Sequence, residues 1–250
     1  EDTDDDKRFR DSLPDATAED KDLRYSLREQ TAPKHTKTAY AVFIVKQHED
    51  GSVTLHPKMI ADEAVGAPPH TWLNADTGKI KRDKQGEPIQ NTRGRVSVRD
   101  AKGAPLAWRP GKHLAAYPNA SQFAVEGDTK GVRDRLPDNV VFFEVEYAAD
   151  RDYQLEAWEY GVNGNGKYEH SQAGLPYIPK DGYYIYRTNA NPNIPAMIIT
   201  GAYRVKRALT DEEAKKLNQE AGGDWYDRKS GQPMTAERLK ELGLDEAGLQ

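Results

Sequence analysis

The 250-residue sequence predicts an α+β domain built on a single curved, mostly antiparallel sheet with short helices. Two observations lead to this class. Runs of β-branched and aromatic residues recur at 38–46, 139–150, 183–188 and 195–209, with the length and alternation of strands. Helical periods are short and lie between or after these runs, and no internal repeat indicates a solenoid.

Charge divides the chain into a tail and a body. Residues 1–30 hold eleven acidic and six basic residues, which accounts for the whole net charge of −5. Residues 1–37 also lack apolar periodicity, so we expect a disordered acidic linker there. A mean hydropathy of −0.90 indicates that only part of the chain contributes to a hydrophobic core. We expect the α+β core at 38–209 and a peripheral helical segment at 210–250.

Composition also limits the class of function. The body is electrically balanced, so its charge gives no general attraction to nucleic acid. The absence of cysteine excludes disulfides, thiolate metal sites and a cysteine nucleophile, and it fits a reducing compartment. No apolar run reaches transmembrane length, so we expect no membrane partner. Because the sequence begins with Glu1, we expect it to be part of a larger polypeptide.

The first half of the body begins with a hairpin. Residues 38–46 form a buried strand in this interpretation, and the turn residues that follow return the chain into a partner strand at 53–60. A short apolar segment lies around residue 72. The polar, glycine-rich stretch 76–105 predicts a long mobile loop. The sequence "YPNASQFAV" at 117–125 predicts a short helix.

The second half holds the clearest strand, at 139–150, where an apolar run gives way to alternation. A helix is expected at 152–161. Two further strands are expected at 183–188 and 195–209, the latter interrupted by Gly201, which suggests a bulge.

Two helix starts are marked in the C-terminal segment. Thr210 and Glu213 have the spacing of a capping box, and Thr235 is placed as the N-cap of a second small helix. Met234 and Leu239 flank that N-cap as a hydrophobic staple would.

Trp108, Arg109 and His113 surround a Pro-Gly pair at 110–111, which predicts a tight turn with a positive φ at the glycine. In a functional interpretation Arg109 anchors an anion, Trp108 lines the site, and His113 donates a hydrogen bond or acts as general base. In the alternative, the tryptophan packs, the histidine caps a carbonyl and the arginine is solvated. The sequence leaves both open.

Glu144 and Glu146 share one face of the expected strand at 139–150, because side chains on a strand repeat every two residues. Such a pair serves acid–base chemistry or binds a divalent metal, with Asp150 as a third carboxylate. Alternatively, this face of the strand is exposed to solvent, and the two glutamates lie beside arginine or lysine from a neighbouring strand.

Three further residues are ligand-binding candidates. His170 lies in a glycine-rich loop that is either a lid or a plain loop. Tyr184 shares a strand face with Tyr186, which suits either stacking on a planar ligand or covering a core, and Arg187 follows directly. Zinc-binding, Walker, GxGxxG and GxSxG patterns are absent, so we predict no metal ligands.

Several motifs spread over the chain carry a resemblance to a phage family: "RYSLRE", "WLNAD", "RPGKHL", "FFEVEYAADRDYQ", "YEHSQAGLP", "DGYYIYRTN" and "ITGAYRVKRAL". The chain resembles C-terminal domains of large polyvalent proteins of bacteriophages and prophages, some attached to MuF-type minor-capsid proteins, and their short phage relatives. The resemblance covers about 38–209. Relatives mostly carry tryptophan where Lys112 stands here. The resemblance supplies a context rather than a mechanism. It leads us to expect a phage-associated domain in the cytoplasm of a bacterial host, either made there or delivered with the virion.

A second resemblance concerns layout. The stretch "PGKHLAAYPNASQF" followed by "NVVFFEVEY" is similar to part of the ADP-ribosyltransferase fold. This implies NAD as cofactor, with His113 beside the NAD cleft and Tyr184 or Tyr186 stacked on the nicotinamide. The chain departs from that family, because its first strand has neither Arg nor His and its late strand has no Glu. Glu144 or Glu146 would have to take the place of that glutamate.

The leading hypothesis is therefore a phage-associated effector or toxin-like catalytic domain that acts on a nucleotide, NAD or nucleic acid. One alternative is a non-catalytic phage module that binds a host or phage macromolecule. Another is a metal-dependent nuclease that uses Glu144, Glu146 and Asp150.

Overall fold

The computed structural model describes residues 32–57, 72–74, 97–99, 105–107, 111–119, 136–161, 173–175, 178–187 and 195–244. Most of the predicted linker lies outside these ranges. So does most of the helix expected at 117–125, and the part that is described, 117–119, is not helical.

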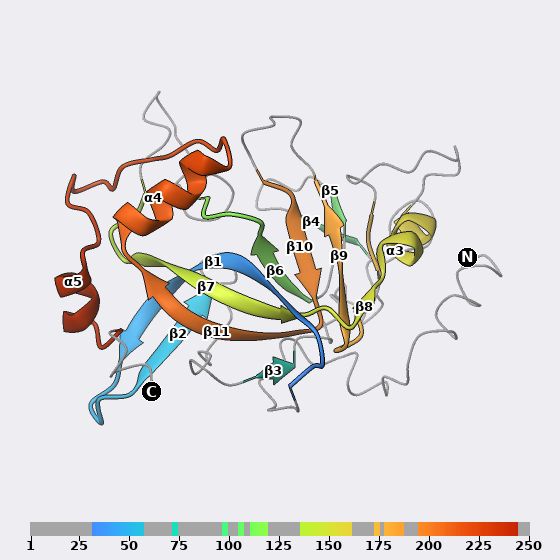
Figure 1. Cartoon of the computed structure of the whole chain (residues 1–250), viewed down its shortest axis with the longest axis horizontal. Coiled ribbons are helices and arrows are strands. Elements are labelled where there is room, and N and C mark those ends of the chain that lie inside the picture. The colour runs from blue at the N-terminus through green and yellow to red at the C-terminus, as the bar shows by residue number, and fades with distance from the viewer. Residues whose placement is uncertain are drawn as a thin grey trace.

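One open sheet of nine strands organises the described chain (Figure 1). Its order is β3 (Leu73–Asn74), β11 (Ala202–Leu209), β7 (Val140–Ala148), β1 (Thr36–Gln47), β6 (Lys112–Ala115), β10 (Met197–Thr200), β9 (Gly182–Tyr186) and β8 (Arg151–Asp152), and β2 (Val53–Pro57) pairs with β1. Among the described strands of this sheet, β8 and β9 are the parallel pair, and the other pairs are antiparallel. The predicted mixed class with a mostly antiparallel sheet and short helices is confirmed.

The centre of the sheet is the pairing of β1 with β7, from Thr36 opposite Ala148 to Ile44 opposite Val140. Both strands alternate between two faces, as their sequences predict. We call the side that carries Phe43 and Phe143 the inner face and the opposite side the outer face. The two phenylalanine rings meet edge to face, with centroids 5.5 Å apart.

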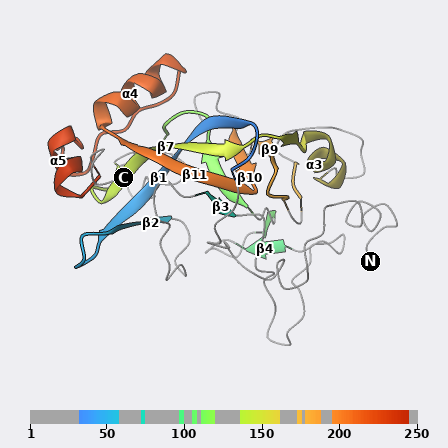
Figure 2. The same cartoon turned by 60° about the horizontal axis from the view of Figure 1, so that its bottom comes forward.

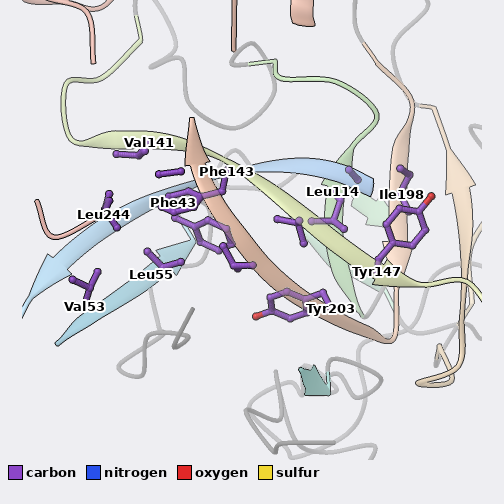
Figure 3. Packing of buried hydrophobic residues seen from close by; sticks show 14 of the residues in the cluster. Phe43, Val53, Leu55, Leu114, Val141, Phe143, Tyr147, Ile198, Tyr203 and Leu244 are labelled. Carbon is purple, nitrogen blue, oxygen red and sulfur yellow. The ribbon is translucent and has the colours of Figure 1, made fainter. Parts of the chain in front are cut away.

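The sheet curls towards its inner face. Tyr147 on β7 and Tyr183 on β9 are separated by β1, β6 and β10 in the sheet order, yet their ring centroids lie 5.3 Å apart. Figure 3 shows the apolar side chains that fill this concavity, with Phe43 and Phe143 at its centre. Burial of this large apolar cluster is the main source of stability for the curled sheet.

The helices lie at two ends of the sheet (Figures 1 and 2). Helix α3 (Gln154–Gly161) lies near β9, and its Gln154 amide exchanges two hydrogen bonds with the backbone of Ile185 at the edge of that strand, of 2.8 and 2.9 Å. Helices α4 (Asp211–Glu220) and α5 (Ala236–Glu241) lie at the other end. The capping box and the N-cap predicted for these two helices are both present.

The C-terminal segment packs more deeply than its polar sequence indicates. Arg228 is buried and makes two contacts of 2.6 and 2.8 Å with the carboxylate of Asp211, the first residue of α4. The same guanidinium donates to the carbonyl oxygens of residues 137, 138 and 140, ahead of and at the start of β7. Met234 and Leu239, the predicted staple, both belong to the inner-face cluster.

Two local expectations were wrong. The stretch 76–105 is not all loop, because β4 (Ser97–Arg99) and β5 (Pro105–Ala107) pair as a separate two-stranded sheet. Gly201 is not a bulge within one strand but the break between β10 and β11, where a Cβ would lie 2.0 Å from the carbonyl oxygen of Pro179. A register shift occurs instead between Val205 and Arg207.

Candidate functional site on the outer face of the sheet

The described part of the predicted Pro-Gly corner begins at Gly111, whose φ of +118° is the positive value that the sequence predicts. A Cβ at this position would lie 2.6 Å from Cγ2 of Ile178 and 2.8 Å from Cγ2 of Ile199. Glycine therefore lets β6 enter the sheet tightly against β10. Trp108, Arg109 and Pro110 lie outside the described residues, so the guanidinium expected beside His113 has no described position.

His113 lies on β6 and reaches Tyr186 of β9 across the intervening strand. The register pairs Ala115 with Met197 and Met197 with Tyr186, so Tyr186 and His113 lie on the same outer face. The His113 Nδ1 atom is 3.2 Å from the Tyr186 hydroxyl. The two rings meet edge to face, with centroids 5.9 Å apart. His113 is half-buried and Tyr186 is buried.

Tyr184 belongs to the core of this face. It is fully buried, and its hydroxyl accepts a hydrogen bond from the backbone N–H of Leu175 at 3.4 Å. Its neighbours in the cluster are the apolar side chains of β10, Met197 and Ile199. Of the two roles that the sequence left open for Tyr184, the structure places it in the one that covers a core.

Glu144 and Glu146 of β7 also lie on the outer face, and both form ion pairs with β11. Glu146 contacts Arg204 at 2.9 Å and Lys206 at 3.0 Å. Glu144 contacts Arg207 at 3.4 Å, and Arg207 also contacts Glu213 of α4 at 2.7 Å. The sequence offered this arrangement as the alternative to acid–base or metal chemistry.

The register shift in β11 is what gathers these cations. Arg204 pairs with Glu146 and Arg207 with Glu144, so the shift inserts one extra residue opposite the same stretch of β7. Val205 and Ala208 consequently keep their place in the inner-face cluster. Arg204, Lys206 and Arg207 all reach the two glutamates on the other face.

The environment of Glu146 decides which chemistry it supports. Burial raises the pKa of its carboxyl, but the hydrogen bond from Lys206 and the charge of Arg204 outweigh burial and bring the pKa below its ordinary value. A carboxylate with a lowered pKa stays ionised at neutral pH and is a weak proton acceptor. Glu146 therefore suits charge pairing better than general base catalysis.

Tyr40 lies between the carboxylates and the histidine. It is opposite Glu144 on β7 and opposite Ala115 on β6, so the register places Glu144 and His113 on one face, two strands apart. Two strand spacings amount to about 10 Å, and His113 is offset from Ala115 by two residues, about 7 Å along β6, so the backbones of Glu144 and His113 lie about 12 Å apart. Burial raises the pKa of Tyr40, and the charge of Glu144 raises it further. Its phenol therefore remains protonated and is a hydrogen-bond donor on this face.

Arg187 lies at the end of β9, next to Tyr186, and shares this end of the sheet with Tyr117, which follows β6. Burial raises the pKa of Tyr117, while the positive charge of Arg187 lowers it and the negative charge of Asp224 raises it. Strands β6 and β9 both run antiparallel to β10, so Tyr117 and Arg187 follow their strands at the same end of the sheet. Among the predicted ligand-binding residues, Arg187 is therefore a cation at the end of the sheet where β6 and β9 both finish.

Two predicted residues remain, His170 and Asp150. His170 lies outside the described residues. Asp150, the third carboxylate of the metal hypothesis, accepts hydrogen bonds from the backbone N–H groups of Lys34 and His35, at 3.2 and 2.6 Å. Within the ranges that the structure describes, no three His, Cys, Asp or Glu side chains are grouped to hold a metal ion.

Sequence reasoning missed Tyr186 as the partner of His113 and missed Tyr40 and Tyr117 altogether. Strand alternation places Tyr184 and Tyr186 on one face, but it does not reveal which strands lie beside them. The contact between residues 113 and 186 depends on β10 lying between β6 and β9. The sequence carries no signal for that order.

Fold and site together define a mixed helix-and-strand domain with a histidine–tyrosine pair on the outer face of an open sheet. Comparison with protein-family models, with curated proteins and with solved structures finds no match to the chain. In the part of the chain that the structure describes, each helix is too short or too polar to span a membrane.

Proposed function

We propose that the chain is a phage-associated effector domain that acts on a nucleotide, NAD or a nucleic acid through the outer face around His113. The observation that supports this most is the 3.2 Å contact between His113 Nδ1 and the Tyr186 hydroxyl. A histidine whose ring is held by a second polar group is the usual arrangement of a proton-transferring residue. The domain would be part of a larger phage polypeptide and would work in the bacterial cytoplasm, either where it is made or after delivery with the virion.

The ligand class follows from the hydrogen-bond chemistry of this face. Tyr40 offers a phenol, His113 an imidazole, and Arg187 a guanidinium at the adjoining end of the sheet. All three are donors, and phosphate oxygens are the acceptors that such a set prefers. In this proposal Arg187 binds a phosphate and His113 donates or moves the proton at the reacting bond.

NAD is the specific substrate that the ADP-ribosyltransferase-like layout suggests. That chemistry needs a carboxylate beside the ribose. Glu144 is the better candidate, because its ion pair with Arg207 is longer, at 3.4 Å, whereas Glu146 contacts both Arg204 and Lys206 at 3.0 Å or less. Tyr184 is fully buried, so Tyr186 is the aromatic residue nearer to the surface.

A second candidate is a non-catalytic module that binds a host or phage macromolecule. The ion pairs of Glu144 and Glu146 with β11 favour it, because they use both carboxylates for structure. In this alternative the same histidine, tyrosine and arginine act as contacts for a partner rather than as reacting groups.

Incubation of the chain separately with NAD, AMP, an RNA oligonucleotide and single-stranded DNA tests the proposal, with products separated by chromatography and identified by mass. We expect conversion of one of these, abolished in His113→Gln and retained in His35→Gln, which changes an exposed histidine elsewhere. Calorimetric binding without conversion would favour the binding module. Equal conversion by His113→Gln and the unchanged chain would contradict the proposal.

A further inference from the structure

The pairing of His113 with Tyr186 has a consequence for which imidazole nitrogen carries the proton. Tyr186 is buried on the outer face, in one apolar cluster with Ala115 and Met197. Its hydroxyl is therefore held in one place, 3.2 Å from Nδ1 of His113. The edge-to-face contact of the two rings, at an interplanar angle of 77°, restrains the imidazole as well.

A neutral imidazole has one N–H and one nitrogen that accepts. A phenol is a stronger donor than acceptor at neutral pH, because its oxygen lone pair is delocalised into the ring. Donation from the Tyr186 hydroxyl to Nδ1 requires that Nδ1 carry no proton. The proton of neutral His113 then lies on Nε2.

We propose that Tyr186 is the positioning residue that fixes His113 in the Nε2–H tautomer, so that His113 presents a proton donor to its ligand. Protonation of the ring does not reverse this. In the imidazolium, Nδ1–H donates to the phenol oxygen and Nε2 still carries its proton. His113 therefore offers Nε2–H on both sides of its titration.

This assignment deepens the proposed function and rests on it only for the identity of the ligand. A fixed Nε2–H selects an acceptor atom, such as a phosphate or carbonyl oxygen, and disfavours a ligand donor group at that position. It also makes Nε2 of His113 a hydrogen-bond donor to the ligand rather than a general base, because that nitrogen keeps its proton. An attacking water would need another group to take its proton.

Two-bond proton–nitrogen NMR correlation of the histidine rings tests the assignment without any ligand. The spectrum is recorded on the full chain at about pH 8, above the ordinary histidine pKa of about 6.5. We expect the His113 pattern of a protonated Nε2 and an unprotonated Nδ1. In Tyr186→Phe, the Nδ1 resonance should move towards the value of a ring that exchanges between tautomers.

Tyr183→Phe is the matched control. It removes the hydroxyl of another buried tyrosine on the same strand. The Tyr183 hydroxyl lies 2.9 Å from Lys37 Nζ, and the side chain belongs to the inner face. This variant should leave the His113 nitrogens unchanged, and the amide spectra of both variants show whether the sheet is intact. A protonated Nδ1 in the unchanged chain would overturn the proposal. So would equal His113 shifts in both variants.

The two proposals fail separately. If the tautomer is as stated but no nucleotide is converted or bound, the positioning by Tyr186 stands and the proposed function falls. If a nucleotide is converted while Nδ1 carries the proton, the function stands and the positioning falls.

Discussion

Substitution of Gly111 by alanine tests how the corner before His113 is built. The φ of +118° lies where side chains other than glycine are strained, at a cost of about 1–3 kcal/mol. The added Cβ would also lie 2.6 Å from Ile178 and 2.8 Å from Ile199, both with branched, buried side chains. Crowding of this kind in a core costs about 1–3 kcal/mol more. We expect Gly111→Ala to lose about 2–6 kcal/mol of the free energy of unfolding.

Gly51→Ala is the matched control for this loss. Gly51 also has a positive φ, of +84°, but a Cβ there meets no atom within 4 Å. It should therefore lose only the conformational term, about 1–2 kcal/mol. Urea unfolding of both variants, followed by tryptophan fluorescence, measures the difference. Equal losses in the two variants would refute the reasoning that β6 enters the sheet through a close contact at Gly111.

Two further predictions concern charges elsewhere in the fold. Arg228→Met leaves Asp211 buried without its cation and should cost about 3–5 kcal/mol of the free energy of unfolding in urea. Arg238→Met, at an exposed ion pair, should cost about 0–1 kcal/mol, and similar losses in the two variants would contradict a stabilising role for the buried Arg228–Asp211 pair. The pKa of Glu146 is lower in the folded chain than in the unfolded chain. The stabilisation from its ion pairs is therefore fully present above the ordinary glutamate pKa of about 4.3, and it is lost as the pH falls through the lower pKa of the folded chain. The unchanged chain should therefore lose more stability between about pH 5 and 3 than Glu146→Gln does, and parallel pH profiles would show that the pairs contribute nothing.

Local patterns predicted the elements of this fold well, because each depends on neighbours in the sequence. The apolar run from Val140, followed by alternation from Glu144, marked β7, and the Thr210–Glu213 spacing marked the start of α4. The burial of Arg228 was hidden from such patterns. Its partners, Asp211 and the carbonyls at 137–140, are 17 to about ninety residues away, and an arginine among polar residues looks exposed in sequence.

The candidate site was predictable residue by residue but not as a constellation. The sequence indicated His113, the glutamate pair and Arg187. It also offered cations from a neighbouring strand as one interpretation of Glu144 and Glu146. It could not identify β11 as that strand, nor the register shift that gathers three cations there. The order of β6, β10 and β9 joins His113 to Tyr186, and strand order follows from packing of the whole sheet rather than from local sequence.

The central claim is that the outer face around His113 and Tyr186 is where the chain meets its ligand. NMR titration of the full chain with NAD and with AMP tests this most directly, through the ring resonances of these two residues. We expect saturable shifts at both rings for at least one ligand, and loss of the Tyr186 shift in His113→Gln. Saturable shifts confined to α5 and its surroundings, with both rings unmoved, would contradict it.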